Sequence, residues 1–232
     1  MNARGDGTTW RALAGTALGG YLLLQSLGRT YGATRAERRA MMPGDDLVER
    51  PQTIVTRAVT IPVPPADVWP WLVQVGWHRG GWYTRRWVDV LFFPDNQPSA
   101  DHVIEDFQHL TVGDVVPDGR PDTLCGFEVR ELEPERRLVL HSTTHLPLAW
   151  RVRGRARLSW TWSFVLTPVQ DGRSTRLVFR WRAWTCPWWL TAGVQLAIVP
   201  ADFLMSRDML RGLRRRILRA GRAAVPRRGS TR

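Results

Sequence analysis

Two tryptophan-rich segments, residues 157–166 and 176–184, stand close together near the end of the chain, and a long apolar helical pattern follows them directly. Both segments alternate with a period of two, which predicts antiparallel strands with one buried and one solvated face. A curved aromatic sheet face covered by one helix can leave an apolar hollow, the usual kind of ligand site. In the first segment the apolar set is Leu158, Trp160, Trp162, Phe164 and Leu166, and the polar set is Arg157, Ser159, Thr161 and Ser163.

The rest of the pattern places this pair of strands in an α+β fold. Apolar residues recur every three or four positions over 187–224, which predicts a long C-terminal helix that Pro200 kinks or divides. The turn between the two strands covers 170–173. Upstream we expect a first strand (52–61), two short helices (66–75 and 84–93), a short strand (112–116), a hairpin (126–132 with 137–141) and a loop (142–154).

The N-terminal region contains an uncharged run, residues 12–27, between Arg11 and Arg29. The run falls short of the ~20 apolar residues that span a membrane. A membrane anchor, a packed or amphipathic helix and a cleaved signal therefore all stay open. If it is an anchor, the arginines that follow it place the main domain in the cytoplasm, on the inner face of the cell membrane.

The composition shifts along the chain also suggest where the domains begin and end. We predict an N-terminal hydrophobic helix over 1–30, a linker over 31–51, one main domain over 52–222 and a disordered basic tail over 223–232. Within the linker, Thr34 and Glu37 have the spacing of an N-terminal capping box. The linker should therefore hold a short helix that starts after Thr34.

The order strand, two short helices, antiparallel strands and long C-terminal helix resembles the helix-grip fold of the SRPBCC superfamily, which groups START, polyketide-cyclase and pollen-allergen-like proteins. The resemblance covers about residues 52–220, and the text over 61–69 is similar to the superfamily's opening motif. It implies an antiparallel sheet curved around the C-terminal helix with a cavity between them. Four further stretches resemble a bacterial subgroup of uncharacterised members: 69–76 with 79–83, 108–110, 112–114 and 205–210.

The superfamily includes lipid carriers, hormone receptors, cyclases and oxygenase domains, so the resemblance implies a cavity without choosing a reaction. We predict that the cavity binds a hydrophobic small molecule or lipid, with no cofactor. For any single tryptophan, packing in an ordinary core is the competing interpretation. The predicted lining residues are Trp69, Tyr83, Trp160, Trp162, Phe179, Trp181, Leu190 and Met205.

Catalytic motifs are absent from the sequence. It contains no phosphate-binding loop and no nucleophile elbow, and its five histidines lack the spacing of a metal site. An enzyme of the cyclase or dehydratase kind stays open as an alternative, with Tyr83, His102 or His109 as the acid–base group. A third alternative is a structural, membrane-associated protein whose core is filled by side chains.

Arginine supplies all of the chain's basic side chains apart from histidine. The sequence has 33 Arg, no Lys and a net charge of +12. Ten of these arginines fall within 207–232, which suggests either a solvated helix face or a contact with an anionic membrane surface. Nucleic-acid binding is disfavoured because the tryptophans fall on the strand face opposite most of the arginines. Two cysteines form no disulfide framework, and the sequence leaves the oligomeric state open.

Overall fold

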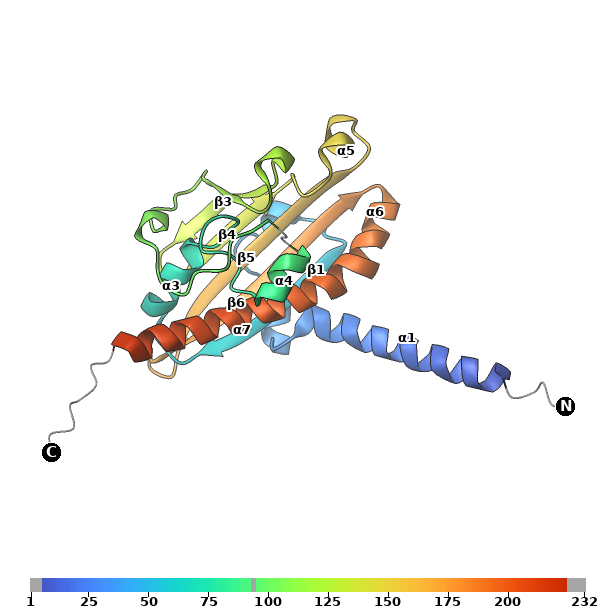
Figure 1. Ribbon diagram of the computed structural model, residues 1–232, viewed down its shortest axis with the longest axis horizontal. Helices are drawn as coiled ribbons and strands as arrows, with labels where there is room; N and C mark the ends of the chain where they lie inside the picture. Colours follow the sequence, from blue (N-terminus) through green and yellow to red (C-terminus); the bar gives the residue numbers. More distant parts are fainter. Residues whose placement is uncertain (1–5, 93–94, 225–232) are drawn as a thin grey trace.

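The computed structural model describes residues 6–92 and 95–224, and Figure 1 shows an antiparallel sheet crossed by a long C-terminal helix. Six strands form the sheet in the order β1-β6-β5-β4-β3-β2. This arrangement confirms the α+β helix-grip fold class. The predicted tail lies outside the described residues from position 225 onward. The strands are β1 (Thr53–Ile61), β2 (Val115–Pro117), β3 (Gly126–Glu133), β4 (Arg137–Ser142), β5 (Arg157–Val169) and β6 (Ser174–Cys186).

The two tryptophan-rich strands are longer than their alternation predicts and pair along their full length. Trp162 lies opposite Trp181, and Phe164 lies opposite Phe179, so the aromatic residues of both strands share one face. The predicted turn is confirmed. Two non-glycine residues in it, Gln170 and Asp171, adopt positive φ angles of 54° and 56°, the conformation that tight hairpins require.

The helices largely follow the predicted order. α3 (Pro65–Val73) and α4 (Arg86–Phe92) follow β1, and the capping box at Thr34 is confirmed at the start of α2 (Arg35–Arg39). The predicted loop 142–154 contains one further short helix, α5 (Leu148–Val152), which the sequence pattern did not indicate. Three 3-10 turns complete this part of the chain: η1 (Asp46–Val48), η2 (Glu105–Phe107) and η3 (Pro121–Thr123).

The C-terminal helix is interrupted just before Pro200, as predicted. It comprises α6 (Trp188–Gly193), a π-helical turn η4 (Val194–Ile198) and α7 (Val199–Ala224). In the turn, the Val199 amide donates to the carbonyl of Val194. Because Pro200 has no N–H group, the carbonyls of Gln195 and Leu196 lose the donors that a regular helix would supply.

Helix α1 (Asp6–Thr30) supplies the missing donors. The Gln25 side-chain amide donates to the carbonyl of Gln195 at 2.6 Å, and the Tyr21 hydroxyl donates to that of Leu196 at 2.7 Å. The second half of α1 is thereby joined to the break in the C-terminal helix. Residues 9–20 are exposed on all sides, and α1 extends away from the sheet in Figure 1.

Helix α1 is not the most apolar helix of the protein. Among the described residues, the only helix long and apolar enough to cross a membrane is the continuous stretch Trp188–Arg222, and this same helix packs on the sheet. A core helix of a soluble protein has the same length and composition, so these properties alone do not place it in a bilayer.

The outer face of the sheet is not solvated along β5 and β6, which corrects the simple alternation of buried and wet faces. Arg180 is 3 % exposed and Thr161 is 2 % exposed, because α2 and η1 cover them. The Arg180 guanidinium donates to the Asp45 carboxylate at 2.8 Å and to three backbone carbonyls between positions 37 and 40. The 31–51 segment thus packs on the sheet by accepting from both Nη atoms of Arg180, while Nε donates to Thr56 of β1.

Candidate functional site

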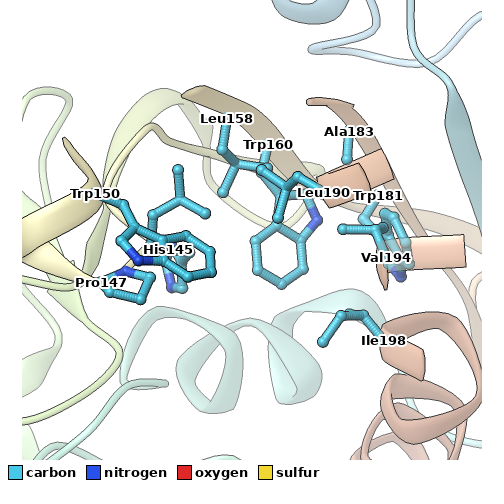
Figure 2. A pocket seen from close by; sticks show the side chains of 11 residues that line it. His145, Pro147, Trp150, Leu158, Trp160, Trp181, Ala183, Leu190, Val194 and Ile198 are labelled. Atoms are coloured by element: carbon cyan, nitrogen blue, oxygen red, sulfur yellow. The ribbon is translucent and has the colours of Figure 1, made fainter. Parts of the chain in front are cut away.

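An apolar pocket of about 420 Å³ lies between the inner face of the sheet and the C-terminal helix. Figure 2 shows the Trp160 indole projecting from β5 into the middle of this pocket, with His145 and Trp150 on one side and Leu190 and Trp181 on the other. The volume falls within the range typical of small-molecule sites. The full lining is His145, Leu146, Pro147, Trp150, Leu158, Trp160, Trp181, Ala183, Leu190, Val194 and Ile198.

Three parts of the chain build the pocket. The period of two places Leu158 and Trp160 of β5 beside Trp181 and Ala183 of β6 on one face, and Trp160 pairs with Ala183 across the strands. On the side facing the sheet, α6 supplies Leu190 and the π-turn supplies Val194 and Ile198. The α5 segment closes the far side, where Trp150 packs edge-on against Trp189 of α6 with ring centroids 5.1 Å apart.

A smaller hollow of about 220 Å³ adjoins this pocket and shares His145, Trp160 and Ile198 with it. Its wall contains two carboxylates, Asp118 and Asp202, among apolar side chains. The two hollows together form a mostly apolar cavity with polar groups confined to one region. The other residues of the smaller hollow are Phe92, Trp162, Ala201 and Met205.

His145 is the hydrogen-bonded polar group that both hollows share. Its Nε2 atom lies 2.9 Å from Asp118 Oδ2, and its Nδ1 atom lies 2.7 Å from Ser142 Oγ. In the tautomer with the proton on Nε2, the ring donates to the Asp118 carboxylate, and the Ser142 hydroxyl can donate to Nδ1. The ring also packs against Phe127 at 4.4 Å between centroids. Within the described part of the chain, no group of three or more His, Cys, Asp and Glu could hold a metal ion.

Asp202 belongs to a buried ion pair beneath the cavity. Its Oδ2 atom accepts from Arg57 Nη1 at 2.6 Å and from the Trp181 indole N–H at 2.8 Å, and Oδ1 accepts from Ser206 at 2.7 Å. The Arg57 side chain is completely buried and also donates from Nε to the carbonyl of Gly28 in α1. The orientation of the Trp181 ring is therefore fixed by a charged acceptor at the base of the pocket.

Five of the predicted lining residues line this cavity. Trp160, Trp181 and Leu190 line the larger hollow, and Trp162 and Met205, together with Trp160, line the smaller one. The shared strand face and the helical spacing bring these five side chains together.

The other three predicted residues lie outside the cavity walls. Phe179 stacks on Phe164 at 4.8 Å within the core, and Trp69 packs against the core from α3. Tyr83 is wholly buried, and its hydroxyl donates to the carbonyl of Trp71 at 2.6 Å. Burial raises the pKa of Tyr83 well above its ordinary value, so this phenol holds its proton near neutral pH.

The structure also separates the candidate acid–base histidines from the cavity. His102 and His109 are exposed and line neither hollow. Sequence reasoning missed the hydrogen-bonded pair that does lie on the cavity wall, His145 and Asp118, and it missed Trp150. The apolar residues over 146–150, between His145 and a run of arginines, were the one local signal for this wall of the pocket, where Leu146 and Trp150 are its more buried members.

Comparison with known proteins finds relatives in structure only. No protein-family model matches the chain, and no curated protein matches its sequence. The solved structures with a similar arrangement include the protein jhp0584 from Helicobacter pylori, at 13 % identity and a TM-score of 0.45 over 78 % of this chain and 97 % of that one.

Two further solved structures are similar at comparable levels. The protein MLL2253 from Mesorhizobium loti has 17 % identity and a TM-score of 0.37 over 72 % of this chain and 98 % of its own. DynU16, a protein of the dynemicin biosynthetic locus, has 19 % identity and a TM-score of 0.37 over 74 % of this chain and 49 % of its own. At such identities the likeness concerns the arrangement of the chain and assigns no function.

Proposed function

We propose that this protein binds an uncharged, largely apolar small molecule or lipid in the cavity between the sheet and the C-terminal helix. The observation that carries the proposal is the pocket of about 420 Å³ lined by three indoles and several aliphatic side chains. A purely structural role would need a core filled by side chains, whereas a pocket lies between Trp160 and Leu190. Empty apolar space in a core costs stability, so its presence favours a bound occupant.

The family assignment belongs to the same proposal. We infer that the chain is a member of the SRPBCC superfamily, because the opening motif over 61–69 falls at the end of β1 and the start of α3, where the fold requires it.

The chemistry of the lining indicates the class of ligand. Among the described residues, no Arg, Asp or Glu lines the larger hollow. A ring system or an acyl chain would therefore meet indole faces and methyl groups without placing a charge in an apolar wall.

The proposal can be tested with native mass spectrometry of the full-length protein, followed by denaturing extraction of anything bound. Affinity is then measured with the neutral apolar dye N-phenyl-1-naphthylamine, whose fluorescence rises in apolar sites. Val194→Trp fills the pocket and should weaken dye binding at least tenfold, whereas Val112→Trp adds the same side chain at a position that is 62 % exposed. Equal dye affinity in both variants, with no co-purified ligand, refutes the proposal.

A second candidate function is proton-transfer catalysis in the same cavity, as in a cyclase or dehydratase. The observation that favours it is the Asp118–His145–Ser142 hydrogen-bonded chain at the wall that both hollows share. Here His145 would exchange a proton with the substrate, Asp118 would hold its ring, and binding would orient an apolar substrate.

The two candidates differ in what a His145→Gln variant retains. An enzyme would leave unreacted substrate in the variant, so the extracted species would differ from that of the wild type, by the mass of one water for a dehydration and by chromatographic retention for a cyclisation, which conserves mass. A binding protein would yield the same species from both. The dye affinity serves as the control that the variant still has a formed pocket.

A further inference from the structure

Exposed apolar side chains of the described residues gather on the segments around the pocket. In α5, Val152 is 78 % exposed, and in α6, Trp188 is 79 % exposed. Helix α1 adds a third uncovered element. Figure 1 shows α1, α5 and α6 at the same end of the protein. The other exposed apolar side chains of these segments and of the adjoining π-turn are Trp10, Leu13, Leu18, Leu22, Leu23, Leu27, Leu148, Trp189, Leu196 and Ile198.

Direct contacts hold these three elements around the pocket. Trp150 and Trp189 join α5 to α6 across its side, and both Trp150 and Leu190 line it. Tyr21 and Gln25 join α1 to the π-turn, whose residues Val194 and Ile198 also line it. The exposed apolar surface is therefore attached to the walls of the pocket rather than scattered over the protein.

Apart from Asp6 at the first position of α1, the charges of these segments are all positive. Residues 7–30, 143–157 and 183–201 contain six arginines and no aspartate or glutamate. Arg153 and Arg155 lie exposed beside the apolar tip of α5. An apolar surface bordered by positive charge is complementary to a bilayer that contains anionic lipids. The six arginines are Arg11, Arg29, Arg151, Arg153, Arg155 and Arg157.

From these observations we infer that the α1–α5–α6 end docks on an anionic lipid bilayer with the pocket opening against it, so that the ligand passes between bilayer and pocket without crossing water. The route of the ligand rests on the proposed function, whereas the docking does not. The part of α1 before its Tyr21 contact, residues 6–20, is about 22 Å long at 1.5 Å per residue, which is short of the ~30 Å hydrocarbon core. It therefore inserts into one leaflet and does not span the bilayer.

The arginines near the end of α7 play no part in this surface. Arg207 and Arg211 lie over the Tyr31 ring, and Arg216 pairs with Asp101 at 3.0 Å. These three arginines have partners within the protein, whereas Arg214, Arg215, Arg219 and Arg222 are exposed, so the predicted membrane contact of the 207–232 region stays a separate prediction at the other end of the C-terminal helix. This difference allows the two surfaces to be tested separately.

The test is co-sedimentation of the full-length protein with phosphatidylcholine vesicles, with and without phosphatidylglycerol. We expect binding that strengthens with phosphatidylglycerol. Val152→Asp combined with Trp188→Asp should lower the vesicle affinity at least tenfold. Val112→Asp, at an equally apolar exposed position away from this end, should leave it unchanged. Vesicle binding of the double variant equal to that of the wild type overturns the inference.

Two further variants separate charge from ligand binding. Arg153→Gln and Arg155→Gln should each weaken binding to phosphatidylglycerol vesicles by about fivefold and leave binding to pure phosphatidylcholine unchanged. Val194→Trp should bind vesicles normally while it loses N-phenyl-1-naphthylamine, so failure of the pocket and failure of the docking give different results. If Val152→Asp instead dissolves a dimer in sedimentation velocity and the wild type ignores vesicles, this end binds a second copy of the chain and the inference is wrong.

Discussion

Replacing Arg57 with methionine tests whether the buried ion pair holds the floor of the cavity together. The side chain is fully buried, and the substitution removes the 2.6 Å contact to Asp202 and the 2.7 Å bond to the carbonyl of Gly28. Methionine keeps an apolar stem of similar length, so the change removes charge and hydrogen bonds more than volume.

The magnitude follows from what is left behind. Removing one partner of a buried pair costs about 3–5 kcal/mol, because the other charge stays in a poorly solvated place. Asp202 keeps two donors, Trp181 and Ser206, which favours the lower part of that range. The orphaned Gly28 carbonyl adds about 1 kcal/mol. We therefore expect Arg57→Met to lower the free energy of unfolding by about 4 kcal/mol.

Equilibrium urea unfolding followed by far-ultraviolet circular dichroism measures this loss. Arg153→Met is the matched control, because that arginine is exposed and should change the free energy of unfolding by less than ~0.5 kcal/mol. In a double-mutant cycle with Asp202→Asn, the combined loss should fall short of the sum of the single losses by about 2 kcal/mol. A loss below ~1 kcal/mol for Arg57→Met, or strict additivity in the cycle, refutes the reasoning.

Three other predictions address elements that pack around the sheet. Hydrogen bonds from Arg176 lower the pKa of Glu37 from 4.5 to about 2. The stabilisation that this pair provides is therefore complete above pH 4.5 and disappears as the pH falls toward 2. Glu37→Gln should thus lower the free energy of unfolding by about 1–2 kcal/mol in urea titrations at neutral pH, which is less than for a buried pair because this pair is partly hydrated. The difference from the wild type should vanish in acid. Tyr21→Phe should cost about 0.5–1 kcal/mol and speed hydrogen exchange in the second half of α1, while unchanged exchange would contradict the proposed link to the helix break. A Cβ at Gly212 would overlap the Tyr83 carbonyl oxygen, so Gly212→Ala should lower the free energy of unfolding by about 2–3 kcal/mol. The control is Gly221→Ala, which has open space around the added Cβ and should be neutral or stabilising by up to ~1 kcal/mol.

Local chemistry made much of the fold predictable. The period-two alternation placed Trp160 and Trp162 on one face of β5, the capping box placed the start of α2, and Pro200 marked the interruption of the C-terminal helix. Each of these features depends on residues within a few positions of one another. The expectation of a solvated outer face failed at Arg180, because its partners come from residues about 140 positions earlier in the chain.

The candidate site was predictable only in part, for the same reason. Alternation assigns both Trp160 and Phe179 to the inner face. The path of the C-terminal helix decides that Trp160 lines a hollow, whereas Phe179 is packed in the core against Phe164. The Asp118–His145 pair joins side chains 27 positions apart, across the β3–β4 hairpin. The sequence alone thus determined which residues face inward, since that depends on backbone periodicity. Tertiary structure alone decided which inward side chains leave space and which polar groups meet, since both depend on how separate segments pack in three dimensions.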